Sequence, residues 1–337
     1  MVEFVVRRVL WVIPVVIAVA AVTFFLMYRA PGGPWDREKP LPAATLRTLN
    51  ARFGLDKPLW ANPDQTAAIW EAGERNPLAL GGSFLDAQFP NYIFGVFRGD
   101  LGPSYASKGS EDVQELIARK FPVSMKIGLV AIVFAVIVGI PLGVVSALKQ
   151  NTWIDYLSLT TSTIGVSVPT FVSGLLLLLW LSQVFDYQLI RSPDEWEGFG
   201  RAFILPGIVL GLGTMSYIAR LTRTSMLEIK RTDYIRTARA KGLAAGAVIN
   251  RHMLRNALIP IITVLGPAAA DLVTGSIIIE SIFGAPGMGR EFVESISKRD
   301  YSVIMGTAVF YAVLVAIANV FVDLSYGLVD PRIRTRR

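Results

Sequence analysis

Cysteine is absent from this chain of 337 residues, and histidine occurs once, as His252. Without cysteine the chain can form no disulfide, thiolate zinc site, iron–sulfur cluster or cysteine nucleophile. A single histidine cannot form a histidine-rich metal site. We therefore expect His252 to be a solvated helix residue, and we expect no metal or cofactor in this chain.

Charge is also scarce, because only 18% of the residues are Asp, Glu, Lys or Arg, whereas soluble domains carry about 25%. The apolar residues occur in blocks, and a helix needs roughly 20 of them in a row to cross a bilayer core. Asp271 is the only charge in the six blocks, which are residues 9–28, 127–148, 156–185, 202–219, 257–279 and 301–322. The sequence therefore predicts an all-α integral membrane protein with six transmembrane helices.

The N-terminus resembles a signal peptide, since Arg7 and Arg8 precede the first apolar block. However, the block is long for a cleaved signal, and Met27, Tyr28 and Arg29 do not form a small-residue cleavage site. We predict that residues 1–28 are retained as an N-terminal segment and first span.

Positive charge is unevenly distributed between the two sides of the predicted spans. With the N-terminus inside, segments 1–8, 149–155, 220–256 and 323–337 hold 16 Lys and Arg against 6 Asp and Glu. Cytoplasmic loops of membrane proteins carry such an excess. The pattern predicts that both termini are cytoplasmic, and it explains the net charge of +7 without nucleic-acid binding.

Residues 29–126 form the main segment outside the predicted spans, on the extracytoplasmic side. Their middle part, 60–89, is rich in Ala, Pro, Asn and Gly and predicts short helices and loops. Residues 110–120 have amphipathic spacing, with Val113, Leu116 and Ile117 on one face. A loop of this length is usually functional or disordered, and its Trp and Phe content argues against disorder.

The cytoplasmic segment 220–256 predicts two short helices separated by a glycine. Thr232 or Asp233 can cap a helix over 234–241, which Gly242 ends. A second helix over 244–258 leads into the fifth span. The segment is either a solvated basic linker or a docking surface, which would use the apolar residues Ile235, Ala238, Ala240 and Leu243.

Residues 233–242, DYIRTARAKG, resemble the cytoplasmic EAA-type loop of permeases in binding-protein-dependent ABC importers. More narrowly, they are similar to the first permease of oligopeptide, dipeptide and nickel systems. The run RNALIP at 255–260 follows at the spacing of that subfamily. The acidic first residue of the general pattern is missing, since Arg236 and Thr237 stand before Ala238, and this departure is common in the peptide subfamily.

Further stretches carry the same resemblance in the same order along the chain. They are Arg7 and Arg8 with the apolar run that follows them, and residues 99–102, 139–143, 168–171, 219–223, 283–290 and 330–334. Together they cover most of the sequence. Residues 60–88 depart from the pattern and have the character of an insertion in the outer loop.

The resemblance implies a type I ABC importer permease fold in a prokaryotic plasma (inner) membrane. The expected parts are residues 1–28, the outer loop 29–126, and a permease core over 127–337 that contains the coupling segment 220–256. The implied partners are a second homologous permease, two ATPase subunits, a substrate-binding protein, membrane lipid and a peptide substrate, with nickel chelates or oligosaccharides as alternative cargo. The implied ATPase contacts are Asp233, Tyr234, Arg236, Thr237, Ala238, Lys241 and Gly242.

The sequence contains no Gly-x-x-x-x-Gly-Lys-Ser/Thr loop, so this chain cannot hold ATP in that way. We expect a non-catalytic subunit whose partners bind ATP and Mg. An ion-coupled secondary transporter is a remote alternative, which usually needs several charges within the membrane and often internal repeats. A membrane enzyme would need a cluster of catalytic groups that this chain does not supply.

Asp271 is the candidate residue of the translocation path. A charge near the middle of a span costs about 2.5–3.5 kcal/mol on insertion scales, so it normally faces protein or a water-filled cavity. Its carboxylate could meet a cationic group of the cargo, such as the N-terminal ammonium of a peptide. It could instead bond a neighbouring span and hold the two permeases together, and the sequence leaves both interpretations open.

Overall fold

The computed structural model describes residues 2–36, 41–184 and 193–329. The regular secondary structure of this part of the chain is helical, apart from an isolated bridge between Pro103 and Asp112. It has two compact units. The loop unit comprises Met1–Arg119 and Phe292–Val313, and the bundle unit comprises Lys120–Glu291 and Leu314–Arg337. The similarity to an importer permease expected at 330–334 lies outside the described residues.

Five helices within the described ranges are long and apolar enough to cross a membrane. They lie within α1 (Val2–Arg29), α6 (Val113–Leu148), α9 (Ile204–Lys230, preceded by a short turn), α12 (Arg255–Thr274, continuing the helix before it) and α15 (Tyr301–Val329). A bent pair, α7 (Trp153–Ser167) and α8 (Thr170–Val184), brings the count to as many as six. The predicted all-α membrane architecture is confirmed.

The third span is not the single straight helix that its apolar run predicts. The axes of α7 and α8 meet at 108°. Val168 leaves the helical region, with φ −82° and ψ 122°, and Pro169 follows it. Proline lacks an N–H and disfavours the helical conformation of the residue before it, so the helix stops there and restarts at Thr170.

The second and fifth spans differ from their predicted limits in opposite directions. α6 starts at Val113, so the amphipathic segment 110–120 continues directly into the second span. Its predicted apolar face is confirmed, because Val113, Leu116 and Ile117 are all buried. α12, in contrast, ends at Thr274, because Gly275 has a φ of +93° that only glycine adopts easily.

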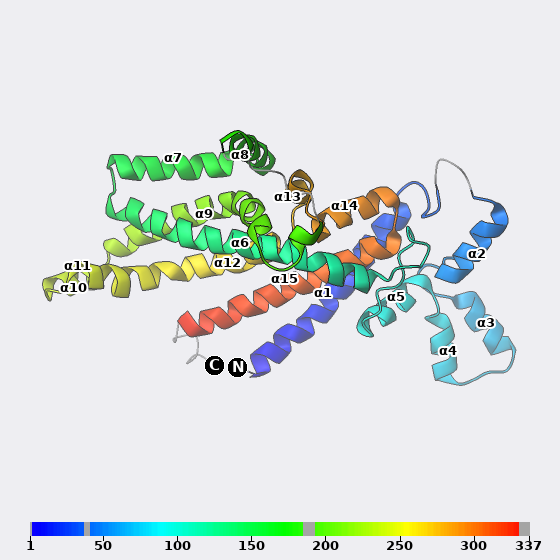
Figure 1. Ribbon diagram of the computed structural model, residues 1–337. Helices are drawn as coiled ribbons and strands as arrows, with labels where there is room; N and C mark the ends of the chain where they lie inside the picture. The colour runs from blue at the N-terminus through cyan, green and yellow to red at the C-terminus, as the bar shows by residue number, and fades with distance from the viewer. Residues whose placement is uncertain (1, 37–40, 185–192, 330–337) are drawn as a thin grey trace. The chain divides into compact units, whose positions relative to one another are not determined.

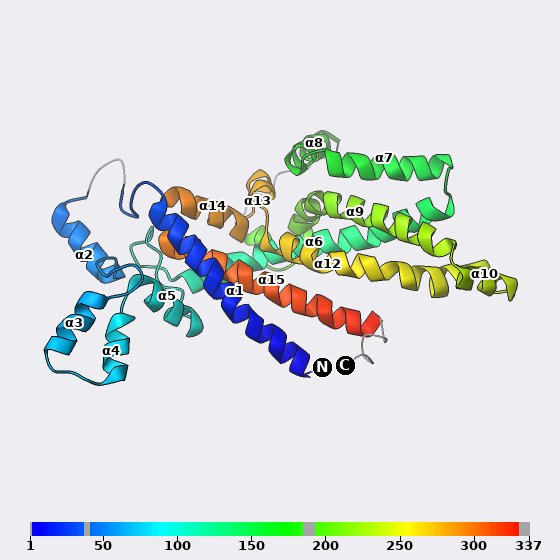
Figure 2. The ribbon, with the colours of Figure 1, turned by 180° about the vertical axis from the view of Figure 1, so that it is seen from behind.

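Four short helices follow α1 in the loop unit: α2 (Ala43–Phe53), α3 (Pro63–Glu71), α4 (Pro77–Phe84) and α5 (Gln88–Phe97). Figure 2 shows them near the C-terminal end of α1. The prediction of short helices between residues 60 and 89 is confirmed. Asn62 and Asn76 begin α3 and α4 in the expected manner, since each side chain accepts a backbone N–H and a proline follows it.

In the bundle unit, α7 and α12 each lie beside α9, as Figure 1 shows. Glycines on α6 bring its backbone close to α9. A Cβ atom on Gly139 would lie 2.7 Å from the carbonyl oxygen of Met215, and one on Gly143 would overlap that of Ala219. Small residues at such crossings let membrane helices pack through their backbones. The short helices α10 (Asp233–Ala240), α11 (Ala245–Ala247), α13 (Ile277–Phe283) and α14 (Met288–Lys298) complete the fold.

The charge distribution predicts which segments face the outside of the cell, and the structure supplies exposed sites to test it. Glu74, Glu197 and Lys241 are all exposed, and the chain has no cysteine of its own. We expect single variants Glu74→Cys and Glu197→Cys to react with a membrane-impermeant thiol reagent in intact cells. Lys241→Cys should react only after permeabilisation. Labelling of Lys241→Cys in intact cells would contradict the orientation.

Candidate coupling surface and buried carboxylates

The predicted cytoplasmic helix exists as α10, and one of its faces is buried within this chain. Ile235 and Ala238 pack in an apolar cluster with Met226 of α9 and with Val248 and Met253. Burial of these two side chains fixes which face of α10 remains for a partner. The docking surface expected from Ile235, Ala238, Ala240 and Leu243 is thus divided, because only the last two are exposed.

The helix, Asp233–Ala240, differs by one residue at each end from the one predicted over 234–241. Thr232 is the residue before the first turn, but its hydroxyl donates to the carbonyl of Ile229 (2.7 Å) instead of capping α10. Gly242 follows the last turn with a φ of +76°, and its N–H donates to the carbonyl of Arg239. A left-handed residue after a helix is a common way to satisfy its last carbonyls.

Most of the residues implied as ATPase contacts are exposed. Six of the seven share this property: Asp233, Tyr234, Arg236, Thr237, Lys241 and Gly242. Ala238 is the exception, since it is 6% exposed and turned into the apolar cluster. Ala240, which the motif did not single out as a contact, lies on the exposed side.

A stretch of π-helix, Val248–Leu254, supports α10 and runs directly into α12. Val248 and Met253 supply the apolar contact, and Asn256 donates to the hydroxyl of Tyr234 (3.0 Å). π-Helical turns are rare and often occur at functional sites. His252 lies in this stretch, and no group of metal-binding side chains occurs among the described residues.

A buried ion pair fixes α7 to α9 beside this region. Asp155 is 1% exposed and accepts two hydrogen bonds from Arg223, Nε to Oδ1 (2.7 Å) and Nη2 to Oδ2 (2.8 Å). The hydroxyl of Ser146 (2.5 Å) and the N–H of Asn151 (2.9 Å) complete its partners. Removing one member of such a pair typically costs about 3–5 kcal/mol, because a buried charge loses its partner.

Sequence analysis missed this pair, because both residues were counted only as loop charges. The position of Asp155, directly before the third predicted span, was the available signal that its carboxylate could be buried. The charge count alone cannot distinguish a solvated Asp from one that is buried against an arginine far along the chain.

Asp271 occupies the last turn of α12 and is exposed in this chain. Its backbone carbonyl accepts the hydroxyl of Thr274 (2.6 Å), whereas its carboxylate has no hydrogen bond or ion pair to any described residue. A neighbouring span of this chain therefore provides no partner for it within the described ranges.

A second buried carboxylate, Glu280, lies in α13 and is 1% exposed. It accepts the hydroxyl of Ser124 (2.7 Å) and the N–H of Arg290 (2.7 Å). Burial raises the pKa of the Glu280 carboxyl, and the hydrogen bonds from Ser124, Arg290 and Gly289 oppose that rise. The sequence alone did not point to Glu280, because a single Glu after an apolar run has no pattern that marks it as buried.

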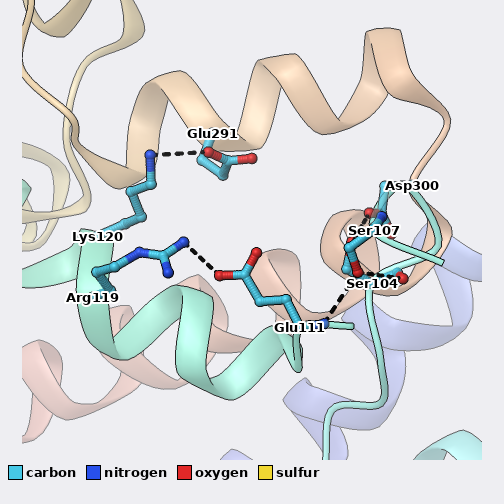
Figure 3. Close-up of polar contacts among 7 residues, drawn as sticks. All are labelled: Ser104, Ser107, Glu111, Arg119, Lys120, Glu291 and Asp300. Atoms are coloured by element: carbon cyan, nitrogen blue, oxygen red, sulfur yellow. Dashed lines mark hydrogen bonds and ion pairs between the residues drawn. The ribbon is translucent and has the colours of Figure 1, made fainter. Parts of the chain in front are cut away.

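A third buried carboxylate, Asp300, organises the loop unit. It accepts the hydroxyl of Ser104 (2.6 Å) and the N–H groups of Tyr105 and Ala106, both at 3.0 Å. It also accepts the N–H of Val303 (3.3 Å) in the first turn of α15. Figure 3 shows Asp300 beside Ser104 and Ser107. One side chain thus holds the loop after α5 against the start of α15.

Aromatic side chains fill the space next to this contact. Successive rings lie within 6.3 Å of one another, centroid to centroid, among Phe24, Tyr28, Trp35, Phe53, Trp60, Phe89, Tyr105 and Tyr301. Five of them, Phe24, Tyr28, Phe53, Tyr105 and Tyr301, border a pocket of about 230 Å³. The aromatic packing holds the segments of the loop unit together.

The three carboxylates share one chemistry, in which hydroxyl and backbone donors surround an acceptor, and Asp155 also has a guanidinium partner. Such sites hold helices and loops in fixed positions.

Comparison with known proteins places this arrangement in a family. A family model described as "Binding-protein-dependent transport system inner membrane component" matches residues 139–335. The chain is 40% identical to the dipeptide transport system permease protein DppB of Bacillus subtilis, over 100% of this chain and 99% of that protein. It is 37% identical to the oligopeptide transport system permease protein OppB of Salmonella typhimurium, over 99% of this chain and 100% of that protein.

A solved structure supports the same fold. The MetNI methionine ABC transporter, in inward facing conformations, matches with a TM-score of 0.54 over 66% of this chain and 99% of that chain. At 19% identity the likeness concerns the fold alone, and it confirms the expected type I importer permease architecture. The family match over more than half of the chain, together with its full-length relatives, shows that this chain belongs to the inner membrane components of binding-protein-dependent transport systems.

Proposed function

We propose that this chain is the peptide-translocating permease subunit of an ATP-driven importer. The observation that carries the proposal is the full-length similarity to a protein named as a dipeptide permease. A second homologous permease completes the membrane path, two ATPase subunits bind ATP and Mg, and a substrate-binding protein delivers the cargo. Nickel chelates and oligosaccharides are the alternative cargo.

Reconstitution of the complete importer in liposomes tests this function. With ATP on the ATPase side and loaded binding protein on the other, we expect a labelled tripeptide to accumulate inside. Accumulation should require this chain, the second permease and the ATPase subunits. A complex that hydrolyses ATP with its binding protein but accumulates a nickel chelate or an oligosaccharide instead would overturn the peptide assignment.

The exposed side of α10 is proposed to contact an ATPase subunit. Its inner face is packed against this chain, which leaves residues such as Tyr234, Thr237 and Ala240 for a partner. Movement of the ATPase would displace α10, and the rigidly attached π-helical stretch would pass that displacement to α12. Coupling of this kind requires two distinct sites and an element that joins them, and here α12 joins the ATPase contact on α10 to the membrane part of the chain.

Two tryptophan variants on opposite faces of α10 separate docking from folding. We expect Ala240→Trp to leave insertion and stability intact, because the position is exposed, and to lower peptide uptake by about tenfold or more through steric exclusion of the partner. Ala238→Trp is the matched variant, and it should destabilise the chain itself because its site is filled. Uptake at the wild-type rate by Ala240→Trp would contradict the assignment. Gly242 is less suitable, since its positive φ penalises any side chain.

The helical hairpin formed by α3 and α4 is proposed to contact the binding protein. It is a self-contained unit, because the N–H of Asn62 donates to the carbonyl of Phe84 (2.8 Å) and closes its two ends. Leu78 is 85% exposed at the start of α4, and Trp70 is exposed with the guanidinium of Arg75 over its ring. Exposed apolar side chains rimmed by charge are typical of protein interaction sites.

Replacing residues 63–83 with a short Gly/Ser linker removes this hairpin between its hydrogen-bonded ends. We expect binding-protein-stimulated ATP hydrolysis to fall severalfold, because the exposed contacts are lost, while basal hydrolysis persists. Leu78→Asp, which keeps the hairpin, should weaken stimulation in the same direction. Full stimulation in both variants would show that the hairpin is not needed for docking.

Asp271 is proposed to face the translocation path or the second permease. The exposed carboxylate without a partner in the described chain supports both positions. Asp271→Asn removes the charge and keeps the shape. If the carboxylate meets the cargo ammonium, uptake of free peptides should fall much more than uptake of N-acetylated peptides, with assembly unchanged. Equal loss for both cargoes, or loss of assembly, would assign Asp271 to the contact between permeases.

A further inference from the structure

Glu280 is a buried ionisable group that neither cargo binding nor ATPase docking explains. An uncompensated buried carboxylate is costly, so its surroundings must supply partners. The hydroxyl of Ser124 in α6 donates to Oε1, and the N–H of Arg290 in α14 donates to Oε2, each at 2.7 Å. The backbone of Gly289 donates a further hydrogen bond. Glu280 thus connects three helices of the bundle unit.

The groups around the carboxylate are all hydrogen-bond donors. The oxygen of Ser124 accepts the N–H of Met288 (2.7 Å), which leaves its own proton for Glu280. The N–H groups of Met288, Gly289 and Arg290 belong to the first turn of α14, where backbone donors have no partner within the helix. A carboxylate accepts such bonds, whereas an amide or a protonated acid would turn a donor toward other donors.

Glycines allow the backbone to approach this side chain from two more directions. A Cβ atom on Gly287 or on Gly275 would overlap the Glu280 carboxyl group. Gly275 is the residue that ends α12, one turn after Asp271. The contact therefore fixes the part of α12 that carries Asp271.

We infer that Glu280 is a positioning residue. Its ionised carboxylate holds three parts of the chain on α6 as one rigid body, namely the last turn of α12, the helix α13 and the first turn of α14. This inference rests on the proposed transport function, because the rigid body presents Asp271. The charged residues nearby are Lys120 of α6 and Arg290 and Glu291 of α14, and Lys120 pairs with Glu291 (3.3 Å), as Figure 3 shows.

Substitution of Glu280 in the reconstituted importer tests the need for the charge. We expect Glu280→Gln to assemble and to take up peptide about tenfold more slowly or worse, because the amide faces donors. Uptake by the wild type should fall as the outer pH passes down through the raised pKa of Glu280, and Glu280→Gln should lack this acid-dependent loss. Glu294→Gln, on α14 and partly exposed, is the control and should keep the wild-type profile. Wild-type uptake by Glu280→Gln would overturn the inference.

A crosslink tests the rigid body without relying on cargo or on the folding of Glu280 variants. In the double variant Lys120→Cys/Glu291→Cys, a short bifunctional thiol reagent should join α6 to α14. We expect equal crosslinking rates with and without ATP plus vanadate, and no loss of ATP hydrolysis after crosslinking. A rate that changes with nucleotide, or hydrolysis blocked by the crosslink and restored by its cleavage, would show that the contact opens in each cycle. These readouts remain valid if peptide is not the cargo.

Discussion

The absence of water in the bilayer core is the constraint on which this structure depends. Every backbone N–H and C=O in that layer must find a partner inside the protein, and helices provide it. The constraint also explains where the fold departs from straight spans. The break at Val168 and Pro169 and the end of α12 at Gly275 release backbone groups, and adjacent short helices begin again within a few residues.

Buried carboxylates are the second organising feature, and each one joins segments that are distant in sequence. Asp155 joins α7 to α9, Glu280 joins α13 to α6 and α14, and Asp300 joins the loop after α5 to α15. In each case a serine hydroxyl and at least one backbone N–H supply donors. Apolar packing is tolerant of small shifts, whereas these polar contacts require a defined geometry, so they set the relative positions of the helices within each unit.

The sequence predicted most of the architecture, because long apolar runs and helix signals act locally. The spans, the short helices between residues 60 and 89, and α10 with its end before Gly242 were all predictable in this way. The inward direction of Ala238 was not, since it depends on contact with Met226 and Met253 from other segments. The partners of Asp155 and Glu280 were hidden for the same reason, because a pairing across 68 or 156 positions leaves no local pattern.

The unbroken helix from Ala245 to Thr274 has a mechanical consequence. Its 30 residues would extend about 45 Å at 1.5 Å per residue. A continuous helix transmits a displacement along its axis, although Pro260 and Pro267 each remove one backbone hydrogen bond from it. A displacement of α10 would therefore reach the turn that carries Asp271 along one continuous backbone, without crossing a loop.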